Sequence, residues 1–62
     1  MTGAEIRELR KALGYTQAKL ADEVGVTANT VARYERDELN PSPPVLKLLK
    51  LLAMLVAERK AA

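Results

Sequence analysis

Residues 16–35, TQAKLADEVGVTANTVARYE, contain two short amphipathic helix patterns separated by a single glycine. Thr16 and Thr27 each precede one pattern, where a threonine hydroxyl accepts a hydrogen bond from a backbone N–H at the start of a helix. Gly25 follows the first pattern, where a helix commonly ends in a left-handed residue that glycine adopts without steric cost. Two helices joined this closely must cross at a steep angle, so the second presents its first turn outward. Such a turn suits the major groove of DNA.

The same patterns predict which side of each helix is buried. In the first, Leu20, Ala21 and Val24 share one face, and Ala21 is small where the two helices should come closest. The inner face of the second helix is predicted to comprise Val26, Val31 and Tyr34. Its outer face would then carry Ala28, Asn29, Ala32, Arg33 and Arg36. An ordinary helical hairpin in a small bundle is the alternative interpretation.

The segment before the motif predicts another helix. Thr2 and Glu5 have the spacing of a capping box, in which each side chain satisfies a backbone N–H at a helix start. This helix should end at Gly14. Its buried stripe is predicted to be Ile6, Leu9, Ala12 and Leu13.

The segment after the motif predicts a long terminal helix. Residues 37–41, DELNP, break the helical period. Ser42 is a candidate N-cap, and the helix should run from Pro43 to about Arg59 because no glycine or further break interrupts it after its start. One stripe of this helix is formed by Val45, Leu48, Leu49, Leu52 and Val56. The stripe is widened by Leu46, Leu51, Met54 and Leu55.

So much apolar surface predicts a homodimer. One small core cannot bury a helix that is apolar around most of its circumference, and large exposed apolar patches usually mark interaction sites. The residues expected near the dimer interface are Leu51, Met54, Leu55 and Glu58. Alternatively, the extra leucines cover neighbouring loops within one monomer.

The stretch from Ile6 to Leu52 resembles the helix-turn-helix domain of the Cro and phage-repressor family, often called Xre-like. The residues that carry the resemblance are Gln17, Leu20-Ala21, Val24-Gly25-Val26, Val31 and Tyr34-Glu35, together with the flanking segments IRELRKALGYTQ and NPSPPVLKLLKLLA. The resemblance implies an all-α fold, a small lambda-repressor-like bundle of four to five helices. Residues 1–62 are expected to form one such domain, which leaves no room for an enzyme cleft beside its core.

Family resemblance also implies a DNA-binding transcriptional regulator, most often a repressor, that binds double-stranded DNA at an inverted-repeat operator with the helix Thr27–Arg36. The positions that match base-facing residues are Thr27, Ala28, Asn29 and Arg33. Gln17 matches a glutamine that meets a phosphate and supports the reading helix. Arg10 and Glu35 match a largely buried ion pair between the first and third helices.

The charges themselves suggest further phosphate contacts. Lys19, Arg33 and Arg36 are candidate cations on the two motif helices, and the backbone N–H groups that follow Thr16 favour an anion. The net charge is only +2, and the loop after the reading helix begins with Asp37 and Glu38, where family members often carry basic residues. This acidic loop predicts a lower affinity for DNA and a weaker salt dependence.

A second resemblance offers an alternative function. The run NPSPPVLKLLKLL is similar to the ending of helix-turn-helix antitoxins that repress their own operon. A protein of that kind would use its leucine-rich helix to bind a partner toxin.

Composition excludes several other classes. The chain has no cysteine and no histidine, which argues against zinc sites of the usual kind, disulfides and most catalytic centres. We therefore expect no metal, no cofactor and no enzymatic activity. The sequence shows neither a signal-peptide pattern nor a membrane span, and a cytoplasmic location is expected.

Overall fold

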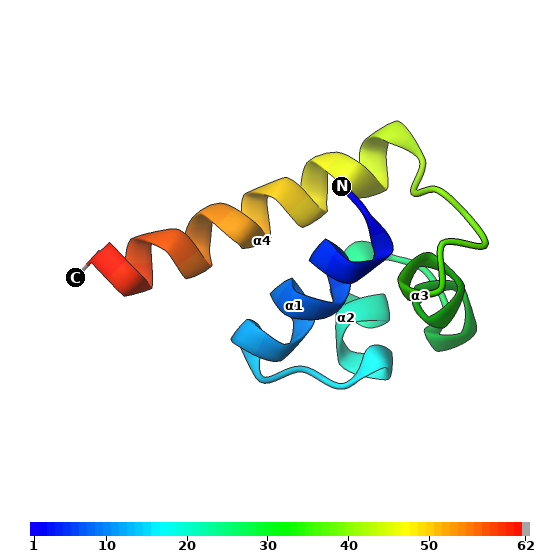
Figure 1. Ribbon diagram of the computed structural model, residues 1–62, viewed down its shortest axis with the longest axis horizontal. Coiled ribbons are helices and arrows are strands. Elements are labelled where there is room, and N and C mark those ends of the chain that lie inside the picture. The colour runs from blue at the N-terminus through cyan, green and yellow to red at the C-terminus, as the bar shows by residue number, and fades with distance from the viewer. Residues whose placement is uncertain (62) are drawn as a thin grey trace.

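Four α-helices make up most of the described residues in a computed structural model (Figure 1). They are α1 (Gly3–Leu13), α2 (Gln17–Val24), α3 (Ala28–Glu35) and α4 (Pro43–Ala61). The structure describes residues 1–61, and for residues 60 and 61 it describes the backbone alone. The predicted all-α fold is confirmed: a single long α4 follows the motif, and residues 1–61 contain no strand.

The predicted helix boundaries follow from the capping residues. The Thr2 hydroxyl accepts from the Glu5 N–H at 3.2 Å, while the Glu5 carboxylate accepts from the Thr2 N–H at 2.7 Å. This capping box lowers the pKa of the Glu5 carboxyl. Thr16 accepts in the same way at the start of α2. At the end of α2, Gly25 adopts a left-handed φ of 79°, so the chain turns at once toward α3.

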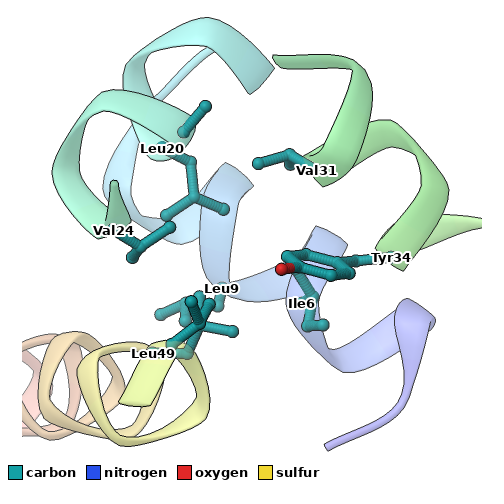
Figure 2. Packing of buried hydrophobic residues seen from close by; sticks show 9 residues of the cluster. Ile6, Leu9, Leu20, Val24, Val31, Tyr34 and Leu49 are labelled. Atoms are coloured by element: carbon teal, nitrogen blue, oxygen red, sulfur yellow. The ribbon is translucent and has the colours of Figure 1, made fainter. Parts of the chain in front are cut away.

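One apolar cluster holds the four helices together (Figure 2). Side chains from all four helices converge there, and Ile6, Leu20 and Val31 have essentially no exposed surface. The complete buried set is Ile6, Leu9, Leu20, Ala21, Val24, Val31, Tyr34, Val45 and Leu49. The motif helices therefore bury the predicted residues, with Val26 half-buried beside them. The prediction was wrong for Ala12, which is exposed because it lies to one side of the stripe that α1 packs inward.

The start of α1 lies directly against the end of α3. The Gly3 N–H donates to the Asp37 carboxylate at 2.9 Å. A Cβ on Gly3 would lie 2.5 Å from the Tyr34 carbonyl oxygen and 2.6 Å from that of Glu35, so only glycine fits there without a shift. Asp37 itself adopts a positive φ of 59°, a conformation unusual for a residue with a side chain. The sequence patterns did not predict this junction.

Helix α4 packs one face on the body and leaves another exposed. It begins at Pro43, with the Ser42 carbonyl accepting from the Leu46 N–H at 2.8 Å, and contacts α1 and α2. Its C-terminal half extends past the other helices along the 34 Å length of the molecule (Figure 1). The inward residues are Val45, Leu49, Leu52, Ala53 and Val56. Leu48 was predicted to belong to this stripe, but it is 41% exposed because it lies at the edge of the face that α4 packs inward.

The predicted interface residues all lie on exposed surface of α4. Leu51, Met54 and Leu55 expose 49%, 59% and 48% of their surface, and Glu58 is also exposed. Together with Leu48, the three apolar residues form the exposed apolar face of α4. None of the helices within residues 1–61 combines the length and hydrophobicity needed to cross a bilayer.

Candidate nucleic-acid interface

The first turns of α3 present a polar surface to solvent. Val31 and Tyr34 hold the helix against the core, and this fixes the opposite side outward. Ala28, Asn29 and Arg33 are exposed there, the Arg33 side chain by 45%. Asn29 makes no side-chain hydrogen bond to the residues that the structure describes. Its amide is therefore available to an external partner.

Thr27 caps the N-terminus of α3, at the start of this surface. Its hydroxyl accepts from the Thr30 N–H at 3.2 Å and shares a hydrogen bond with the Thr30 hydroxyl at 2.9 Å. The predicted N-cap of α3 is thus confirmed. Thr30 is half-buried, and the sequence analysis did not identify its role. The three-residue spacing between Thr27 and Thr30 could have predicted a hydrogen bond between them.

At the start of α2, the candidate phosphate contacts already have partners within the chain. The Thr16 hydroxyl accepts from the Lys19 N–H at 3.1 Å. The Lys19 ammonium lies 3.0 Å from the Glu23 carboxylate and 5.7 Å from the centre of the Tyr15 ring. The hydrogen bond that Lys19 donates to Glu23 is the main reason that the pKa of Lys19 is raised. Lys19 is nonetheless half-exposed, so its ion pair is easily exchanged for another anion.

A largely buried ion pair links α1 to the end of α3. Arg10 donates to Glu35 through Nε at 2.6 Å and through Nη2 at 3.2 Å, and the two side chains are only 16% and 6% exposed. Arg10 also donates to the Tyr15 carbonyl at 3.1 Å, and Gln17 donates to Glu35 at 3.3 Å. This network joins α1, α2 and α3, so it fixes the orientation of α3 relative to the rest of the motif.

The same network sets two protonation equilibria. Burial alone would raise the pKa of the Glu35 carboxyl, but the hydrogen bonds from Arg10 and Gln17 and the positive charge of Arg10 together lower it. The Glu35 carboxylate in turn raises the pKa of Arg10. Both groups are therefore charged at neutral pH.

The cations at the C-terminal end of α3 share one carboxylate. Glu38 accepts from Arg36 Nε at 2.7 Å and from its Nη2 at 3.3 Å, and it lies 3.9 Å from Arg33 Nε. Arg36 lowers the pKa of Glu38, and Glu38 raises the pKa of Arg36. The sequence indicated an acidic loop here but did not predict that it pairs with two candidate DNA-contacting arginines.

Comparisons with known proteins point to one family. The helix-turn-helix family model matches residues 6–49. YgzD of Bacillus subtilis (strain 168), named an uncharacterized HTH-type transcriptional regulator, is 43% identical over 51 residues, which are 81% of this chain and 77% of the relative. An uncharacterized HTH-type transcriptional regulator of Methanothermobacter thermautotrophicus (strain Delta H) is 51% identical over 37 residues, 60% of this chain and 54% of that protein. No solved structure matches the chain.

Proposed function

Because the chain belongs to the Xre/Cro-like helix-turn-helix family, we propose that it is a sequence-specific DNA-binding transcriptional repressor that reads its operator with α3. The observation that carries this proposal is the outward surface of α3, where Asn29 and Arg33 project from a helix whose other side is buried. The α1–α2–α3 network around Glu35 keeps that surface rigid. Such a regulator would act in the cytoplasm.

Base reading is assigned to the four residues at the start and outer side of α3. The Asn29 amide suits the paired donor and acceptor of adenine, and the Arg33 guanidinium suits the two acceptors of guanine or a phosphate. Ala28 offers a methyl group to a thymine methyl. Thr27 lies at the start of the surface, and its hydroxyl can form one hydrogen bond beyond the two that it makes with Thr30.

Phosphate binding is assigned to the start of α2 and the end of α3. The N–H groups at the start of α2 point along a helix dipole that favours an anion, and Thr16 and Lys19 lie beside them. The exposed residue Arg36 would contact the backbone at the opposite end of the reading surface. Gln17 is already bonded to Glu35, so it would contribute to phosphate binding while supporting α3.

The proposed assembly is a homodimer that joins two copies through the exposed apolar face of α4. Leu48, Leu51 and Leu55, followed by Glu58, are spaced 3, 4 and 3 residues apart, which forms a seam along one side of a helix. Burying a leucine is worth about 1.5–3 kcal/mol, so several leucines from two copies can exceed the cost of association. A two-fold dimer implies inverted half-sites separated by about one turn of DNA.

Charge favours an antiparallel arrangement of the two α4 helices. If Leu51 packs on the partner's Leu55, then Glu58 lies beside the partner's Lys47 at each end of the seam. A parallel arrangement would instead place Glu58 against Glu58 and Lys47 against Lys47, which is unfavourable. Met54 would flank the centre of the antiparallel seam.

Selection from random duplex DNA tests the reading surface. The wild-type protein should enrich a sequence with two inverted half-sites. Replacing Asn29 and Arg33 together by alanine should abolish preference for that sequence, while the dimer and the melting temperature stay unchanged because both side chains are exposed. Lys11→Ala removes an exposed cation from α1 and serves as the control. Unchanged affinity of the double variant for the selected operator would contradict the assignment.

An antitoxin-type interaction module is the second candidate function. The observation that favours it is the same exposed apolar face of α4, which a partner toxin could cover instead of a second copy. Sedimentation equilibrium of the isolated protein distinguishes the toxin-binding module from the homodimeric regulator. A monomer at micromolar concentration would favour the partner protein, and a dimer would favour self-association.

A further inference from the structure

Glu38 lies just beyond the C-terminal end of α3, where its carboxylate pairs with two exposed arginines. Its two carboxylate oxygens accept from two N–H groups of Arg36, and one of them lies 3.9 Å from Arg33. The arginines are 55% and 45% exposed, and Glu38 is 50% exposed, so the cluster faces solvent beside the base-reading residues.

We propose that Glu38 is an intramolecular competitor of the DNA phosphate, which lowers affinity and salt dependence by neutralising Arg33 and Arg36. This inference rests on the proposed function of α3. It differs from a merely acidic loop, because it assigns the effect to one carboxylate and to the two guanidinium groups that it contacts.

The geometry makes the competition direct. A guanidinium donates two N–H groups in a fixed fork that matches a carboxylate and a phosphate equally well. Arg36 directs two donors at Glu38, so a phosphate can use them only after Glu38 has moved. Exposed ion pairs contribute little stability because water screens them, so DNA can displace the carboxylate. The displaced carboxylate would still lie near the phosphate and repel it.

Neighbouring acidic groups do not share this role. Asp37 accepts from the Gly3 N–H, and Glu35 is held by Arg10 and Gln17. Within the part of the chain that the structure describes, Glu38 is therefore the single carboxylate paired with the two exposed arginines of this end.

Glu38→Gln tests the proposal because glutamine keeps the shape and removes the charge. We expect roughly three- to tenfold tighter binding to the selected operator at about 0.1 M salt. The slope of log K against log salt should also become steeper by about 0.9 for each additional phosphate that the freed arginines neutralise. Glu8→Gln is the matched control, since it removes one exposed carboxylate from α1 without touching either arginine.

Fluorescence anisotropy with the operator and with a random duplex, between about 50 and 300 mM salt, measures both the affinity and the slope. In an Arg36→Ala background the increase in affinity from Glu38→Gln should shrink, because Glu38 then has one guanidinium fewer to neutralise. If Glu38→Gln behaves as Glu8→Gln does, or binds more weakly than wild type, the competition is disproved while the reading helix stands. If the wild-type protein selects no sequence and binds no duplex, the proposed function itself fails.

Discussion

Gly3 has no side chain, and this lets α1 and α3 pack closely and so positions α3. Its missing Cβ lets the start of α1 approach the last carbonyl oxygens of α3. The Asp37 carboxylate then accepts from the Gly3 N–H at the N-terminus of α1, where the helix dipole favours a negative charge. Asp37 thus helps to hold α1 against α3, whereas the other acidic residue of the loop, Glu38, lies beside the proposed DNA-binding surface.

Gly3→Ala should destabilise the protein even though alanine favours a helix more than glycine by about 1 kcal/mol. The new methyl group would lie within 2.6 Å of two backbone oxygens, which cannot move as a flexible side chain can. We expect a net loss of about 1–3 kcal/mol in the free energy of unfolding, measured by urea denaturation.

Gly14→Ala is the informative comparison for this variant. Nothing lies within 4 Å of a Cβ at Gly14, but its φ is 71°, so any loss there reports backbone strain alone, at about 1–2 kcal/mol. Equal stability of Gly3→Ala and wild type would show that the α1–α3 junction relaxes freely.

Residue-scale patterns predicted the caps, and the resemblance predicted that Arg10 and Glu35 pair. Threonines before apolar runs carry a local signal, because a cap involves residues three apart. The contact of Gly3 with Asp37 spans 34 residues and depends on how α1 crosses α3. No local pattern encodes such an approach, so the sequence could not reveal it.

At the scale of the element, one face of α4 packs on α1 and α2, and another is proposed to join two copies of the chain. The sequence predicted that α4 carries too many leucines for one core, and the structure leaves Leu48, Leu51 and Leu55 exposed. It did not predict the rotation of the helix, because the apolar residues surround most of its circumference. Only packing against α1 and α2 decides that Leu49 is buried and Leu48 is not.

Charge reversal tests the antiparallel pairing of α4. Lys47→Glu alone and Glu58→Lys alone should each weaken the dimer, because each places like charges together at both ends of the seam. The double variant should restore it, since the pairs are re-formed with exchanged signs. Dimer dissociation constants from analytical ultracentrifugation, at about 50 mM salt where screening is weak, measure the effect.

Recovery in the double variant is specific to the antiparallel arrangement. In a parallel dimer each exchanged residue would still face the same residue of the partner, so like charges would remain together. The double variant would then not restore the dimer. Unaltered dissociation constants in all three variants would place the interface away from these positions.

At the scale of the whole molecule, stability should depend on pH through carboxyl groups that folding makes more acidic. The folded pKa values of Glu5, Glu35 and Glu38 all lie below the ordinary value of 4.5. Such groups stabilise the fold above the unfolded pKa, and the stabilisation is lost as the pH falls through the lower folded value. We therefore expect the free energy of unfolding to be constant near neutral pH and to fall below about pH 4.5.

Glu35→Gln separates the contribution of the buried network from that of the exposed groups. Near pH 7 it should cost on the order of 3 kcal/mol, because Arg10 would keep its charge in a largely buried site without a counterion. Its free energy of unfolding should also fall less steeply in acid than that of wild type. Urea denaturation from pH 3 to 7 measures both, and an unchanged acid profile would exclude Glu35 as a source of the dependence.

The number and order of the helices were predictable because start and stop residues mark each helix and α1, α2 and α3 each carry one apolar face. The order of the helices and the outward position of Asn29 and Arg33 follow from those local signals. The interactions of the arginines with Glu38 do not, because they depend on side-chain positions in an irregular turn.

The outward side of α3 makes few demands on folding, because Val31 and Tyr34 hold the helix from within. Exchanging the exposed residues Ala28, Asn29 and Arg33 for others should therefore alter DNA preference at little thermodynamic cost. Under the proposed function, a few substitutions on this side would change DNA specificity while the fold stays intact. If α3 reads DNA as proposed, the same property would let exchanges on its outer side produce variants that bind new operator sequences.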